Sequence, residues 1–244
     1  MGENRKLGEL HPPLDLDEKL TVIYGRPGCM KSVMVCALAR LYFEKTGKPP
    51  LLIWADENLH GEYGTKLAEF VFGDVGKGER RTLLRKAQRP SYIFSILGDV
   101  LSDKKEERYK ISFVALDSVG GTIDSIMTNP ENMHERSIAS AWLRFIALRL
   151  ETIAHKRKIP AIMIAHTIPT IQDEWHGEKE RPSFTLRAIH HAEIVIKQTL
   201  EKTKEGKKVL WKIVMHRYDP DLEGKSIDVT YLIERVPKPK EIPV

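Results

Sequence analysis

The chain has 244 residues, 41% of them hydrophobic, and its 39 basic and 34 acidic residues give a formal net charge of +5. This length and composition suit one domain with a full core, so we expect no second module. No run approaches the roughly 20 apolar residues of a membrane helix, which argues against a membrane partner. The small basic excess is compatible with a polyanionic partner but does not require one.

Short apolar runs bounded by turn-forming residues predict buried parallel strands. In chain order these runs are Leu20–Tyr24, Leu51–Ala55, Phe113–Leu116 and Ala161–Ala165. Helical patterns separate them: one from Lys31 to Lys45, closed by Gly47, and one from Glu135 to Lys158, ended by Pro160. In the second helix the apolar residues that recur near helical spacing are Ile138, Trp142, Phe145, Leu148 and Ile153.

The pattern changes after Ala165, where a polar loop runs to Arg187. Three further strands are predicted near Ala192–Leu200, Lys208–Met215 and Ser226–Ile233. The order predicts an α/β fold whose largely parallel central sheet is flanked by helices and extended by C-terminal antiparallel strands. We expect the domain to span residues 20–236, between an N-terminal arm of residues 1–19 and a C-terminal tail of residues 237–244.

A glycine-containing loop follows the first strand directly and leads into the first helix. Its sequence is Gly25-Arg26-Pro27-Gly28-Cys29-Met30-Lys31-Ser32. In this context backbone N–H groups and a helix N-terminus surround a phosphate chain, so Lys31 is expected to contact the β- and γ-phosphates of ATP and Ser32 to bind Mg²⁺. The usual pattern has glycine where Met30 stands, and a side chain there restricts φ. An ordinary glycine-containing turn is the alternative interpretation.

The two cysteines, Cys29 and Cys36, flank the start of this helix too far apart for a disulfide. The N-terminus shows no apolar segment behind a basic start. Together these features predict a soluble, cytoplasmic protein in a reducing compartment.

Acidic residues follow two of the predicted strands. Asp117 comes directly after Phe113–Leu116, where a carboxylate can hold Mg²⁺ through its water shell. Glu57 is separated from Leu51–Ala55 by one residue, Asp56, and it could orient or deprotonate an attacking water. The carboxyl ends of neighbouring parallel strands converge on a ligand, which favours these roles. The alternatives are a capping aspartate at a turn and a solvated loop acid.

These segments resemble the RecA superfamily, which includes RecA, RadA and RadB, the phage UvsX-type recombinases, and the DnaB and RepA helicases. The resemblance covers about residues 18–235 and implies a RecA-like core. In that family the catalytic glutamate ends the strand after the phosphate loop, which corresponds to Glu57. Leu116-Asp117-Ser118 is similar to the family's metal-binding strand end.

Further site residues are implied by this resemblance. The strand Ile159 to Thr167 looks like the one whose tip senses the γ-phosphate, which implies His166 as the sensor; the alternative is an ordinary hydrogen-bonded histidine. Arg217 matches the arginine that DnaB-like members insert into a neighbouring subunit's ATP site, although Met215 occupies the place of their lysine. An exposed arginine that is merely solvated is the alternative. Tyr63 lies near the position of an adenine-stacking aromatic in RecA, one residue short, and a packed surface tyrosine is the alternative.

In the recombinases, the loops after the metal-binding and sensor strands line the DNA channel; here they correspond to residues 119–134 and 168–187. The second loop contains basic and aromatic residues that could neutralise phosphates and stack bases, together with four acids. These residues are His176, Lys179, Arg181, Arg187, Trp175 and Phe184, with Asp173, Glu174, Glu178 and Glu180 as the acids.

The resemblance therefore implies an ATPase that uses ATP and Mg²⁺, binds single-stranded DNA and acts in homologous recombination or repair. It would assemble as a homo-oligomer, in a filament or ring, or join a full-length recombinase. A DnaB- or RepA-like helicase or loader is one alternative. A KaiC-like signalling ATPase without a DNA partner is another.

Overall fold

The computed structural model describes residues 11–87, 89–105, 107–118, 133–169, 175–182, 186–204 and 206–237. Its strands are β1 (Leu20–Gly25), β2 (Leu51–Trp54), β3 (Leu84–Lys86), β4 (Val114–Asp117), β5 (Ala161–Pro169), β6 (Glu180–Pro182), β7 (Ile194–Thr203), β8 (Gly206–His216) and β9 (Ser226–Asp228). Its helices are α1 (Lys31–Thr46), α2 (Glu62–Phe72), α3 (Lys77–Leu83), α4 (Pro90–Ser102), α6 (Met133–Arg157), α7 (Leu186–Ile189) and α8 (Thr230–Ile233), with 3-10 helices η2 (Glu57–His60) and η3 (Pro220–Leu222).

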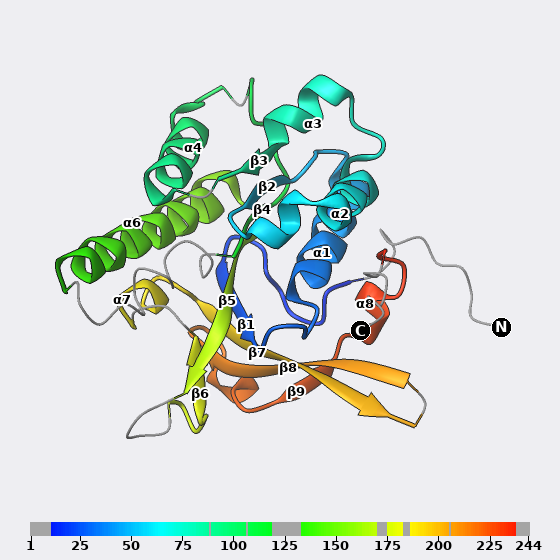
Figure 1. Ribbon diagram of the computed structural model, residues 1–244, viewed down its shortest axis with the longest axis vertical. Coiled ribbons are helices and arrows are strands. Elements are labelled where there is room, and N and C mark those ends of the chain that lie inside the picture. Colours follow the sequence, from blue (N-terminus) through cyan, green and yellow to red (C-terminus); the bar gives the residue numbers. More distant parts are fainter. Residues whose placement is uncertain are drawn as a thin grey trace.

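The strands form one mixed sheet in the order β3-β2-β4-β5-β1-β7-β8-β9, and β6 pairs with β5 off this path. The six strands from β3 to β7 in this order are parallel, whereas β8 and β9 are antiparallel additions. Helices α4, α6 and α7 cover one face, and α1, α2 and α8 cover the other (Figure 1). The predicted largely parallel sheet with an antiparallel extension is confirmed.

The predicted parallel strands form for the expected reason: each is buried along its whole length between two helical layers, except at the end of β5. The first helix also ends as predicted. Gly47 adopts a left-handed conformation with φ 67°, and its N–H donates to the carbonyl of Phe43 at 2.8 Å, which closes α1.

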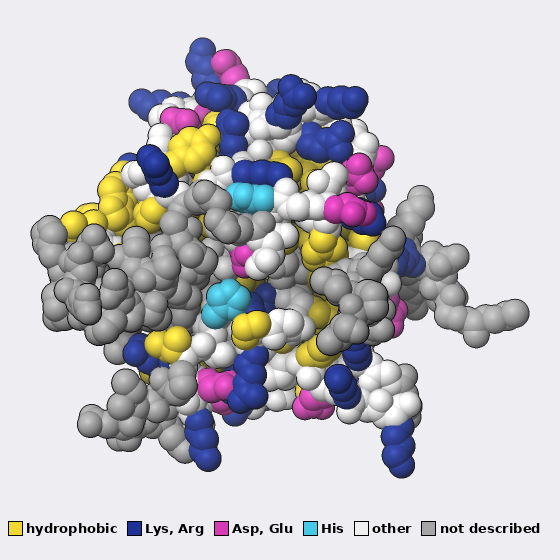
Figure 2. Space-filling view, in the orientation of Figure 1, with side chains coloured by type: hydrophobic (Ala, Val, Ile, Leu, Met, Phe, Trp, Pro, Cys, Tyr) yellow, Lys and Arg dark blue, Asp and Glu magenta, His cyan; other side chains and the backbone are white. Residues whose placement is uncertain are grey.

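Helix α6 is present, but most of the apolar residues that the sequence indicated do not face the core. Ile138, Phe145 and Leu148 are exposed, and hydrophobic side chains gather on this part of the surface (Figure 2). Instead, the buried face consists of smaller and medium side chains, many of them alanines, which let the helix lie close to the sheet. These are Ala139, Leu143, Ile146, Ala147, Leu150, Ile153 and Ala154.

The strand predicted at Ser226–Ile233 is wrong in its second half. Strand β9 ends at Asp228, whose carboxylate accepts hydrogen bonds from the backbone N–H of Thr230 at 2.9 Å and from its hydroxyl at 2.6 Å. This local bonding turns the chain into α8, which buries Leu232 and Ile233.

The described part of the predicted N-terminal arm, from residue 11 onward, packs on the domain. Leu14 and Leu16 are buried in the same hydrophobic cluster as the sheet, and so is Val236 at the other end. Among the described helices, none combines the length and apolar character that crossing a bilayer requires.

Candidate functional site

The loop from Gly25 to Ser32 lies at the carboxyl edge of the sheet, between β1 and α1. Gly28 and Met30 both have left-handed backbones, with φ of 78° and 68°. Glycine adopts this conformation freely, whereas a residue with a side chain is strained there by about 1 kcal/mol. Met30 thus has the backbone conformation that glycine adopts readily, and its carbonyl accepts the N–H of Met34 at 3.0 Å to begin the helix.

Lys31 is 5% exposed, and its ammonium group lies inside the loop. Nζ donates to the carbonyl oxygens of Gly25 at 2.8 Å and Arg26 at 3.0 Å. Two neutral carbonyl oxygens therefore hold this positive charge, and a phosphate, which binds an ammonium group more strongly, could replace them.

The loop is tied to the sheet by a residue that the sequence analysis missed. The buried side chain of Gln198, on β7, donates from Nε2 to the carbonyl of Cys29 at 2.7 Å and accepts from Trp211 Nε1 at 2.9 Å. Position 25 requires glycine because a Cβ there would collide with the backbone carbonyl oxygen of Gln198. The sequence gives only a weak signal for this role, because Gln198 stands between Lys197 and Thr199 at the polar end of a predicted strand.

Asp117 ends β4 beside Trp54 of β2 and is 3% exposed. Burial raises the pKa of its carboxyl to about 6, and a hydrogen bond from Ser32 acts in the opposite sense. A buried carboxylate that shares a hydrogen bond with a hydroxyl offers two oxygen ligands and needs a compensating cation. Ser32 and Asp117 therefore fit Mg²⁺.

His166 lies on β5 directly beside Gly25 of β1. Its Nε2 is 3.5 Å from Ser118 Oγ, while its Nδ1 is buried without a hydrogen-bond partner. Burial, followed by the charge of Lys31, lowers the pKa of this imidazole. A neutral ring with one unused nitrogen can accept a further polar partner in the cleft.

The segment after β2 brings other polar groups to the same edge. Asp56, which the sequence analysis did not single out, accepts the N–H of Asn58 at 2.9 Å and begins η2. The backbone N–H of Ala55 donates to the carbonyl of Asp117 at 2.7 Å, which joins the ends of β2 and β4. Glu57 follows as the first residue of η2, and its side chain lies outside the described part of the structure.

Most of the expected site residues line one cleft of about 260 Å³. Its lining includes Pro27, Gly28, Met30, Lys31, Ser32, Asp56, Tyr63, Asp117 and His166. Tyr63 is partly buried against the hydrophobic core in this wall, and stacking on adenine stays a prediction.

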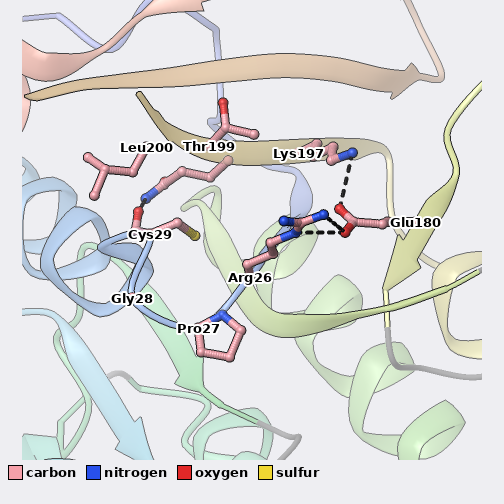
Figure 3. Close-up of a pocket in the computed structure, with 9 residues that line it drawn as sticks. Arg26, Pro27, Gly28, Cys29, Glu180, Lys197, Thr199 and Leu200 are labelled. Atoms are coloured by element: carbon pink, nitrogen blue, oxygen red, sulfur yellow. Dashed lines mark hydrogen bonds and ion pairs between the residues drawn. The ribbon is translucent and has the colours of Figure 1, made fainter. Parts of the chain in front are cut away.

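A second cleft, of about 430 Å³, lies on the other side of the loop between Arg26 and β7 (Figure 3). Arg26 pairs with Glu180 at 2.7 Å, and Glu180 also pairs with Lys197 at 3.3 Å. Pro27 and Gly28 line both clefts, so the loop forms the ridge between them.

Arg217 does not lie with these groups. It follows β8, whose last residue His216 pairs with Ile194 at the start of β7, so Arg217 lies at the opposite edge of the sheet. Its guanidinium is exposed and donates to the carbonyl of His190. A contribution of Arg217 to the nucleotide site would therefore have to be made to another chain, as the resemblance implied.

The two loops expected to contact DNA are described only in part. Residues 119–132 lie outside the described structure, as do Asp173, Glu174 and Phe184. In the second loop, Trp175 packs edge-on against Tyr24 with ring centroids 5.9 Å apart. Glu178 accepts from Lys197 at 2.7 Å, so this acid is paired toward the sheet.

Basic side chains are most concentrated elsewhere on the face shown in Figure 2, above the nucleotide edge and over α3. Helix α3 carries Lys77, Arg80 and Arg81, and β3 carries Arg85 and Lys86. A solvated helix face accounts for basic residues of this kind.

Comparison with solved structures shows that the fold is similar to the one in the "Crystal structure of the RadB recombinase". The TM-score is 0.58 over 87% of each chain, at 18% sequence identity. No protein-family model matches the sequence, and no curated protein matches it significantly. The likeness confirms the expected RecA-like α/β fold.

Proposed function

We propose that the chain is an ATPase that binds ATP with Mg²⁺ and acts on single-stranded DNA in homologous recombination or repair. The observation that carries the proposal is the convergence of Lys31, Ser32, Asp117 and His166 in one cleft at the carboxyl edge. The similarity of the fold to a RadB recombinase supports the choice among nucleotide-dependent activities.

Each group in the cleft has a role that its chemistry suits. Lys31 would exchange its two carbonyl partners for the β- and γ-phosphates, and bound Mg²⁺ would neutralise phosphate charge at Ser32 and Asp117. His166 would use its unpaired Nδ1 to detect the γ-phosphate. Glu57, placed one residue after Asp56, would orient or deprotonate the attacking water.

A ring-forming motor of the DnaB type is the second candidate. It is favoured by Arg217, whose exposed guanidinium faces away from its own chain's nucleotide loop. An arginine supplied by a neighbouring subunit can stabilise the charge that develops on the γ-phosphate.

The test is an ATPase assay with and without single-stranded DNA, combined with negative-stain imaging in the presence of a non-hydrolysable ATP analogue. We expect DNA-stimulated hydrolysis in filaments, with Lys31→Ala inactive. Closed rings would favour the helicase. DNA-independent hydrolysis without DNA binding would favour a signalling ATPase. If Lys31→Ala hydrolysed ATP at the wild-type rate, the assignment of the nucleotide site would be refuted.

A further inference from the structure

A second group of polar side chains lies at the amino edge of the sheet, opposite the nucleotide loop. Glu151 and His155 are four residues apart on α6 and therefore project from the same side of the helix. Glu193 stands immediately before β7 and is fully buried. One donor atom from each of these three residues lies within 4.8 Å of the other two.

The buried carboxylate of Glu193 is held in place from several directions. Oε2 accepts the backbone N–H of Leu20 at 2.6 Å. Oε1 is 2.8 Å from His155 Nε2 and accepts from the Tyr218 hydroxyl at 3.3 Å. Carboxylates that bind metals are themselves oriented by hydrogen bonds, and Glu193 meets this condition.

Glu151 has its own orienting partner. His191 Nδ1 lies 2.7 Å from Glu151 Oε2, and both side chains are mostly buried. In the described part of the chain, the ion pairs of Glu151 and Glu193 are thus made by histidines, which are charged only when protonated. Two carboxylates and two imidazoles therefore supply oxygen and nitrogen donors within a small space, a combination that a divalent cation can bind.

We propose that Glu151, His155 and Glu193 bind one Zn²⁺ ion, with water as the fourth ligand and His191 orienting Glu151. One imidazole and two carboxylates are a donor set that suits Zn²⁺ better than Mg²⁺, which prefers oxygen ligands alone. Ligand atoms around tetrahedral Zn²⁺ lie about 3.3 Å apart. Binding of Zn²⁺ would open the His155–Glu193 contact from 2.8 Å and draw together the donors that lie up to 4.8 Å apart, which needs only small side-chain rotations on the partly exposed helix face.

The metal would join three parts of the chain that are distant in sequence. It would connect the end of α6 to the start of β7 and, through the Leu20 N–H bond, to the start of β1. The backbone N–H of Arg217 donates to the Glu193 carbonyl at 2.8 Å, so the segment after β8 is attached to the same point. The site is separate from the nucleotide cleft and does not depend on the proposed function.

The test is calorimetric titration of the nucleotide-free protein with Zn²⁺ and, separately, with Mg²⁺. We expect one Zn²⁺ per chain and much weaker Mg²⁺ binding. His155→Asn and Glu151→Gln change partly exposed residues and should weaken Zn²⁺ binding at least roughly tenfold. His155→Cys should restore tight binding, because a thiolate is a good Zn²⁺ ligand and a mere ion pair would not be rescued.

Two matched variants separate this site from others. His176→Asn removes an exposed histidine outside the cluster and should bind Zn²⁺ like the wild type. His166→Asn tests the nucleotide cleft and should also retain binding. The proposal is overturned if the wild type binds no Zn²⁺, if His155→Asn binds it equally well, or if binding is lost in His166→Asn instead.

Discussion

Replacing Asp117 by asparagine should stabilise the nucleotide-free protein, and the gain should grow with pH. Burial raises the pKa of this carboxyl from 3.8 to about 6, a difference that corresponds to about 3 kcal/mol at 1.36 kcal/mol per unit. Because the folded state holds the proton more tightly than the unfolded state, the wild type loses stability as pH rises through this interval. Asparagine carries no charge and retains an oxygen for the Ser32 hydroxyl.

The gain can be measured by urea unfolding of both proteins at pH 5 and pH 8 without nucleotide. About half of this difference should appear between these two pH values, because the carboxyl of the folded wild type is still largely protonated at pH 5. Asp221→Asn is the control: it removes a carboxylate at an exposed position, so it shows how much the free energy of unfolding changes when a carboxylate is lost outside the cleft. With saturating Mg-ATP the wild type should become the more stable of the two proteins, since the ligand stabilises only the protein that binds it.

A stability difference between wild type and Asp117→Asn that is equal at both pH values would refute the reasoning. So would a wild type that gains stability relative to the variant as pH rises. Either result would mean that the buried carboxylate is compensated without a metal.

Four further outcomes are expected. Glu57→Gln should bind ATP but release no phosphate, because only the group that activates water is lost; normal hydrolysis would place the base elsewhere. Gln198→Ala should lower the free energy of unfolding by about 2–4 kcal/mol in urea, since it leaves two buried polar groups unpaired; an unchanged midpoint would contradict the anchoring role. A thiol reagent should modify Cys29 slowly, because burial raises the pKa of its thiol. The modification should block nucleotide binding, and Mg-ATP should protect the thiol. Equal labelling with and without Mg-ATP would contradict a phosphate-enclosing loop. Inactive Arg217→Ala and Lys31→Ala chains should regain part of the ATPase activity when mixed, because each supplies what the other lacks, and continued inactivity despite co-assembly would exclude a shared site.

Much of the nucleotide edge could be predicted because parallel strands carry their ends to one place. Once β1, β4 and β5 were identified from their apolar runs, Lys31, Asp117 and His166 were expected near one another, and they line the same cleft. The short edge strand β3 could not be predicted in this way, since its Leu84-Arg85-Lys86 sequence carries the charges typical of a sheet edge.

Other features depended on tertiary contacts that no local pattern contains. The sequence pattern assigned the large apolar residues of α6 to the core-facing side of the helix. Two of them, Trp142 and Phe145, instead pack against Phe94 of α4, with ring centroids 5.3 and 6.2 Å from that of Phe94. The inward side is rich in alanine, whose small size matters only once the sheet is in place. The role of Gln198 likewise exists only because β7 lies beside the loop.

The left-handed conformation of Met30 bears on how such loops are identified in diverged sequences. A motif that demands glycine before the lysine specifies a residue type, whereas the fold specifies a torsion angle, here φ 68°. The strain of about 1 kcal/mol is similar to the net contribution of one hydrogen bond, so a well-packed domain can tolerate it. Asparagine and aspartate adopt this region more readily than methionine and should be accepted at the same position. A pattern defined by strand, permitted torsion, lysine and helix would therefore recover relatives that a glycine requirement discards.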